Sequence, residues 1–133
     1  MTTRERVALA YFGVLQTLHA AFLAVFFLSP DAIWSVLPEA ARPSAGIQTA
    51  FQINAAVDVL VIALSLVWAV RSWRQDRWIG GLLGGCIDMA VYSALFFAGL
   101  AWVSGMVAAA PLLMLAFAVP FGPVFWVWGM RGG

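Results

Sequence analysis

The chain has 133 residues, of which 64% are hydrophobic and only 10% are charged, and its formal net charge is +1. A soluble domain is about half apolar and about one quarter charged, so this composition excludes an ordinary water-soluble fold and indicates an integral membrane protein. A helical span needs about 20 apolar residues. The length therefore predicts one domain, residues 1–133, made of four membrane-spanning helices: an all-α bundle.

The first apolar segment, residues 7–29, follows a short basic start. Its apolar run holds Gln16 and His19 near the middle and ends without the small-residue pattern of a cleavage site. We therefore expect a retained first span rather than a secretory signal peptide.

The loop after this span is the one long connection, and it holds three of the six prolines. It begins with Ser29-Pro30-Asp31, a capping hydroxyl followed by proline at the first helical position. This pattern predicts a short interfacial helix in the first outer loop. We expect its apolar residues to face lipid, namely Ile33, Trp34 and Leu37.

The second and third spans, residues 48–70 and 78–100, are joined by the short basic connector RSWRQDRW and form a tight antiparallel hairpin. Glycines at the start of the third span, with spacings of three to four residues, predict close approach to another helix, within the chain or in a homo-oligomer. They are Gly80, Gly81, Gly84 and Gly85.

The fourth span, residues 105–128, carries three prolines that predict kinks. The sequence PFGP at 120–123 marks a bend or a break near its end, while Pro111 lies near its start.

Arginine placement predicts the orientation. With four spans, only Arg42 falls on one side of the membrane, and both termini are expected in the cytoplasm with the other six: Arg4, Arg6, Arg71, Arg74, Arg77 and Arg131. The arginines form no basic stripe, which excludes a familiar nucleic-acid interface. The absence of lysine favours a GC-rich bacterial genome, and so the bacterial cytoplasmic membrane.

Three spans carry a polar pair at helical spacing: Gln16 with His19, Asn54 with Asp58, and Asp88 with Tyr92. Spacings of three and four residues put the members of each pair on one helix face. At about 1.5 Å per residue, the three ionisable side chains of these pairs lie roughly 15–20 Å from the cytoplasmic edge of a core about 30 Å thick. We therefore expect His19, Asp58 and Asp88 to face one another around a cavity.

No arginine lies at that depth, so only His19 can offset the two aspartates. An Asp at the centre of a spanning helix costs about 2.5–3.5 kcal/mol on insertion scales. At least one is therefore expected to be protonated, to share a proton with its neighbour, or to meet a cation from outside the chain. A carboxyl group in that state suits general acid catalysis near neutral pH.

One Cys and one His do not make a familiar zinc or haem site, and no phosphate-binding or dinucleotide-binding glycine pattern occurs. We expect no metal and no cofactor. The sequence predicts an intramembrane acid–base enzyme, an isomerase, a cyclase or an epoxide-opening enzyme, acting on a lipophilic small molecule between the helices. The predicted catalytic residues are Asp58, Asp88 and His19. The predicted substrate-binding residues are Gln16, Asn54 and Tyr92, with Phe12, Phe22 and Phe96 offering π faces to a carbocation.

Two other functions fit the same residues. In a small proton-coupled exporter of lipophilic cations, Asp58 and Asp88 alternately bind protons and the cation. In a non-catalytic membrane subunit, the aspartates pair with an arginine of a partner protein.

Overall fold

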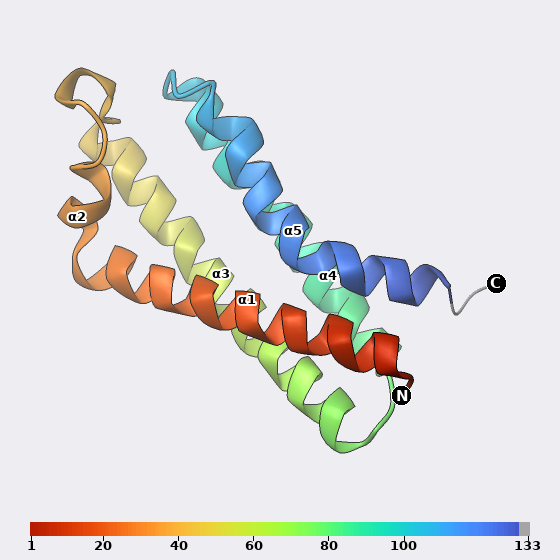
Figure 1. Ribbon diagram of the computed structural model, residues 1–133. Helices are drawn as coiled ribbons and strands as arrows, with labels where there is room; N and C mark the ends of the chain where they lie inside the picture. The colour runs from red at the N-terminus through yellow and green to blue at the C-terminus, as the bar shows by residue number, and fades with distance from the viewer. Residues whose placement is uncertain (131–133) are drawn as a thin grey trace.

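The computed structural model describes residues 1–130, apart from the side chains of Gly81 and Leu82. This part of the chain consists of helices joined by short loops: α1 (Thr3–Leu28), α2 (Pro30–Trp34), the 3-10 turn η1 (Glu39–Ala41), α3 (Ala45–Arg74), α4 (Gly80–Val103) and α5 (Ala109–Gly129) (Figure 1). Four of them, α1, α3, α4 and α5, are long and apolar enough to cross a membrane. The predicted all-α bundle of four spans is confirmed, and this is the architecture of a multi-pass membrane protein.

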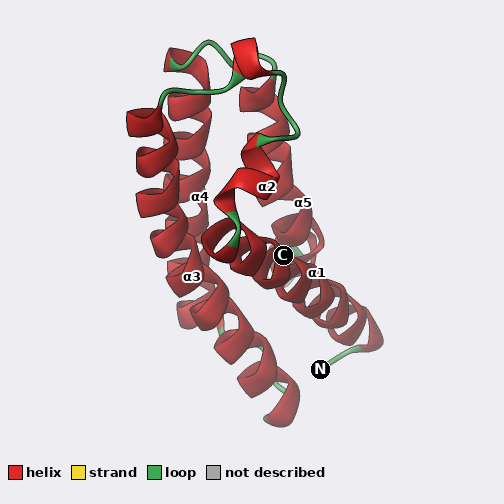
Figure 2. Cartoon of the chain, turned by 90° about the vertical axis from the view of Figure 1, so that its left-hand side faces the viewer, coloured by secondary structure: helices red, strands yellow, loops and turns green. Residues whose placement is uncertain are grey.

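The four long helices form a ring in which each has two neighbours. α1 packs against α3 and α5, and α4 packs against the same two helices. Figure 2 shows α3 and α4 side by side, and in Figure 1 α1 crosses in front of α3. α1 and α4 therefore lie diagonally across from each other, and side chains from both can reach the space beside α3.

Both ends of the described chain lie at one end of the bundle (Figure 1). The N-terminal ammonium lies 3.1 Å from a carboxylate oxygen of Asp76, in the connection between α3 and α4, and the Arg6 guanidinium lies 2.9 Å from the same oxygen. The hydrogen bond from the ammonium holds the pKa of the Asp76 carboxyl below its usual range. A chain with an even number of spans must have both termini at the same end of the bundle, as observed. The side of the membrane that this end faces stays a prediction. Arg131, one of the arginines on which that prediction is based, lies outside the described residues.

The short helix of the first loop forms as predicted, but its tryptophan points the other way. Trp34 is only 8% exposed, and its ring meets those of Phe26 and Phe51 at centroid distances of 5.8 and 5.5 Å. Ile33 and Leu37 pack against the same cluster. The expectation of a lipid-facing side chain is therefore wrong for Trp34, because α2 folds over the end of the apolar core between α1 and α3; Ile33 and Leu37 are half-buried beside it.

Three of the glycines at the start of α4, namely Gly80, Gly84 and Gly85, are not used for close packing against the described part of the chain. A Cβ atom built on Gly80, Gly84 or Gly85 would meet nothing within 4 Å. No other helix of the described chain therefore approaches these three glycines closely. Close approach of a helix from another molecule stays a prediction.

α5 continues through Pro120 and Pro123 without a break, and Figure 1 shows it bent. Proline has no backbone N–H, so Pro123 leaves the carbonyl of Val119, four residues earlier, without its helical donor. The hydroxyl of Tyr11 on α1 donates to that carbonyl at 3.4 Å. A side chain from the neighbouring helix thus compensates for the proline.

This compensation predicts that the contribution of Tyr11 to the free energy of unfolding depends on Pro123. Tyr11→Phe removes the donor and is expected to lower the free energy of unfolding by about 0.5–1 kcal/mol. Pro123→Ala restores the helical N–H to Val119, so Tyr11→Phe should cost nothing further in that background. Reversible unfolding of the two single variants and the double variant in mixed micelles measures the coupling, and equal costs in both backgrounds would contradict it.

Candidate functional site

Asp58 of α3 is the centre of a buried polar cluster. The residue is 1% exposed, and its Oδ1 accepts a hydrogen bond from the hydroxyl of Ser93 on α4. Asn54, one turn earlier on α3, donates from Nδ2 to the Ser93 Oγ at 3.2 Å and to the Ser93 carbonyl at 3.4 Å. The amide, hydroxyl and carboxyl groups form a directed chain that links α3 to α4 in the core of the bundle.

Helical periodicity explains why these residues meet. The buried positions of α3 recur every three or four residues and include Asn54 and Asp58 among apolar and small side chains. The inward face of α4 likewise carries Ala90, Ser93 and Ala94. Small residues let the two helices lie close enough for a short Ser side chain to reach the carboxyl group.

His19 of α1 approaches the other oxygen of the same carboxyl group. Its Nε2 lies 3.8 Å from Asp58 Oδ2, and its side chain is 24% exposed. This separation is within ion-pair reach but too long for a hydrogen bond. The imidazole also meets the ring of Phe117 on α5 edge-on, at a centroid distance of 5.5 Å. His19 therefore connects the buried carboxyl group with the surface of the bundle.

Two acceptor atoms in this region have no hydrogen-bond partner among the described residues: Asp58 Oδ2 and Gln16 Oε1. Gln16 is 1% exposed and lies one turn before His19 on α1. A buried acceptor left unpaired costs about 1–3 kcal/mol. Gln16 Oε1 is therefore suited to accept a hydrogen bond from a bound molecule, and Asp58 Oδ2 is free to exchange a proton with one.

The sequence prediction that Asp88 faces Asp58 is wrong. Asp88 lies on the exposed face of α4, and Tyr92, one turn later, is exposed on the same face. Ser93 follows Asp88 by five residues, which places the two side chains about 140° apart around the helix. α4 therefore turns Ser93 inward and Asp88 toward lipid, and depth alone did not bring the two carboxyl groups together.

The predicted aromatic residues do not gather around Asp58 either. Phe12 is fully buried, but it packs edge-on against Trp68 and Phe121, at centroid distances of 5.3 and 5.0 Å, in the apolar cluster nearer the termini. Phe22 and Phe96 are 51% and 40% exposed and point away from the core. Of the residues predicted from the sequence, the structure brings together Asp58, His19 and Asn54, and it buries Gln16 on the same helix as His19.

Ser93 is the residue that the sequence reasoning missed. A single serine in an apolar helix is an ordinary packing residue, so its residue type gave no signal. Its position in the sequence did give one: Ser93 is three residues after Ala90 and four before Phe97, in a series with Cys86 whose other members are buried. Alignment with that series of small and apolar residues marks it as inward-facing.

Among the residues that the structure describes, no group of three or more His, Cys, Asp or Glu side chains is arranged to hold a metal ion. The functional groups of the site are one carboxyl group (Asp58), one imidazole (His19), two amides (Asn54 and Gln16) and one hydroxyl (Ser93). Comparisons with models of protein families, with curated proteins and with solved structures find no match to this chain.

Proposed function

We propose that this chain is an intramembrane acid–base enzyme in which Asp58 and His19 exchange protons with a lipophilic small molecule. One observation carries the proposal: Asp58 is held by Ser93 through one oxygen, while its other oxygen has no hydrogen bond and lies 3.8 Å from the partly exposed His19. Acidic residues within membrane spans are rare, and those that face the bundle interior mark proton or substrate pathways. The single carboxyl group with its imidazole replaces the pair of aspartates that the sequence predicted.

The roles follow from the positions of the groups. Asp58 gives a proton to a carbon–carbon double bond, a carbonyl oxygen or an epoxide oxygen. His19 then takes a proton from a neighbouring carbon in an isomerisation or cyclisation, or from a water molecule in an epoxide opening. Transfer of that proton from His19 to Asp58 restores the starting state, so no oxidant or reductant is needed. Gln16 Oε1 offers an acceptor for a hydroxyl group of the substrate, and Asn54 fixes Ser93.

The proposed setting is the bacterial cytoplasmic membrane, with both termini on the cytoplasmic side. The supporting observations are the absence of lysine and the placement of Arg4, Arg6, Arg71, Arg74 and Arg77 at one end of the bundle. A lipophilic substrate would reach His19 from the hydrocarbon, because the imidazole is the exposed member of the pair.

The substrate does not have to be identified before the proposal is tested. Protein in lipid nanodiscs is incubated in D₂O with a panel of lipophilic alkenes, ketones and epoxides, and products are analysed by mass spectrometry. A proton-exchanging enzyme should give deuterium-labelled isomers, cyclised products or diols with at least one compound class, and Asp58→Asn protein should give none. Identical product patterns from wild-type and Asp58→Asn protein would overturn the proposal.

A second candidate function, proton-coupled export of a lipophilic cation, is favoured by the exposed face of α4. Asp88 lies one turn before Tyr92, whose ring stacks on that of Phe96 at a centroid distance of 6.4 Å. A carboxylate beside aromatic rings attracts an organic cation. In liposomes, this function requires proton-linked flux of the cation that Asp88→Asn abolishes. Absence of flux in wild-type protein would exclude each cation tested.

A further inference from the structure

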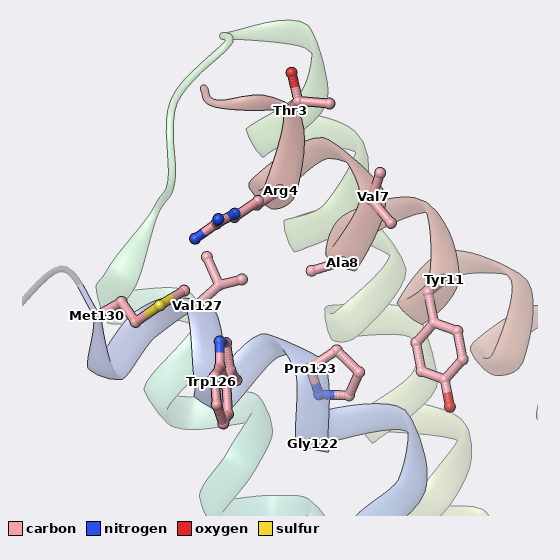
Figure 3. Close-up of a pocket in the computed structure, with 10 residues that line it drawn as sticks. All are labelled: Thr3, Arg4, Val7, Ala8, Tyr11, Gly122, Pro123, Trp126, Val127 and Met130. Carbon is pink, nitrogen blue, oxygen red and sulfur yellow. The ribbon is translucent and has the colours of Figure 1, made fainter.

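A groove lies on the outside of the bundle, between the first turns of α1 and the last turns of α5 (Figure 3). Its volume is about 670 Å³, within the range of small-molecule sites. Apart from Thr3 and Arg4 at one end, its lining is apolar or glycine: Val7, Ala8, Tyr11, Gly122, Pro123, Trp126, Val127 and Met130. It includes none of the residues around Asp58.

The groove continues into a polar space at the end of the bundle. A second cavity of about 610 Å³ shares Thr3, Arg4, Val127 and Met130 with the groove and adds Thr2 and Glu5. An apolar channel that opens into a polar compartment fits a molecule with an apolar chain and a polar head. The two compartments meet at Arg4.

Arg4 offers an available positive charge at this junction. Figure 3 shows its side chain directed across the mouth of the groove toward Met130. Within residues 1–130, its guanidinium is in none of the hydrogen bonds or ion pairs of the chain. The neighbouring Glu5 carboxylate is engaged in the helix cap, where it accepts the Thr2 N–H at 2.6 Å. The N-terminus of α1 adds a partial positive charge, and a guanidinium binds phosphate oxygens in pairs.

We propose that this groove binds a phospholipid with an anionic headgroup, with its phosphate at Arg4 and one acyl chain along the groove. Two observations select a lipid over a soluble anion: the groove walls are apolar, and Val7 and Trp126 are 63% and 72% exposed toward the surroundings. The groove also lies at one end of two spanning helices, where a bilayer would supply both acyl chains and headgroups. The charge complementarity at Arg4 selects an anionic headgroup over a zwitterionic one.

Native mass spectrometry of the protein in detergent tests this proposal, with phosphatidylglycerol and phosphatidylcholine of identical chains as probes. Wild-type protein should bind phosphatidylglycerol more tightly. Arg4→Gln should weaken binding of phosphatidylglycerol about fivefold and change binding of phosphatidylcholine little. Arg77→Gln is the matched control, since Arg77 lies in the connection between α3 and α4 and donates to Gln75. It should leave both affinities unchanged.

A second variant tests the apolar part of the groove. A Cβ atom on Gly122 meets nothing within 4 Å, so Gly122→Leu can fill the groove without displacing the backbone, and it should weaken binding of both lipids. Gly129→Leu, on the same helix but outside the groove, should not. Wild-type affinities from Arg4→Gln and Gly122→Leu would overturn the proposal. Equal affinity for glycerol phosphate, which has no acyl chain, would overturn its lipid part.

Discussion

Asp58→Asn protein is expected to fold like the wild type and to lose about 10²–10⁴-fold in turnover of the substrate identified by product screening. The amide has the shape of the carboxyl group, and its oxygen can still accept the hydrogen bond from Ser93. It cannot give up a proton at neutral pH, so the chemical step loses its acid while the contact between α3 and α4 remains. The measurement is kcat/KM in nanodiscs, with the unfolding midpoint recorded for the same samples.

Asp88→Asn is the matched control. It makes the same chemical change at nearly the same predicted depth, but on the exposed face of α4. Turnover should therefore stay at the wild-type level. Equal losses in Asp58→Asn and Asp88→Asn would show that both carboxyl groups take part, as the sequence alone predicted, and would contradict the arrangement seen in the structure.

His19→Gln separates the two members of the proposed pair. Imidazole is the side chain that normally changes charge between pH 5 and 8. Its replacement should lower turnover and flatten the pH dependence over that interval. An unchanged pH profile would remove His19 from the proton path and leave Asp58 acting alone.

The number of spans could be predicted from hydropathy because each helix must dissolve in hydrocarbon over its whole length. That same property hides the direction of each side chain. A span that is apolar on all sides has no polar stripe to mark its outward face, so residue counting predicts depth but not rotation about the helix axis. Asp58 and Asp88 can therefore be assigned to one level by counting residues, but the expectation that they face each other had no physical basis.

Small residues carried more of the rotational information than the polar ones. On α4, the alignment of Cys86, Ala90 and Ala94 marks the inward face, and Ser93 belongs to it. Asp88 and Tyr92 fall on the other side. Trp34 shows the related limit for loops: a tryptophan near a membrane surface is usually an interfacial anchor, and only the fold of α2 back over the bundle turns it inward.

Ser93→Ala is expected to lower the free energy of unfolding by about 1.5 kcal/mol. This value lies near the upper limit of the contributions measured for interhelical hydrogen bonds in membranes. It is also near the lower limit for hydrogen bonds to charged groups. The change removes the only hydrogen-bond donor that the described residues provide to Asp58. It also removes one of the two acceptors of the Asn54 amide, and the backbone carbonyl at residue 93 remains. Reversible unfolding in mixed micelles measures the loss.

Ser72→Ala supplies the comparison that isolates the hydrogen bond from the loss of a buried hydroxyl group. Ser72 of α3 is also fully buried, and its Oγ has no hydrogen-bond partner among the described residues. Removing a buried, unpaired hydroxyl group relieves its desolvation cost, so this variant should be as stable as the wild type or slightly more stable. If both alanine variants lost the same stability, the cost would be one of packing. The Ser93 hydroxyl would then not hold Asp58, and the orientation of Asp58 Oδ2 toward His19 would lose its structural cause.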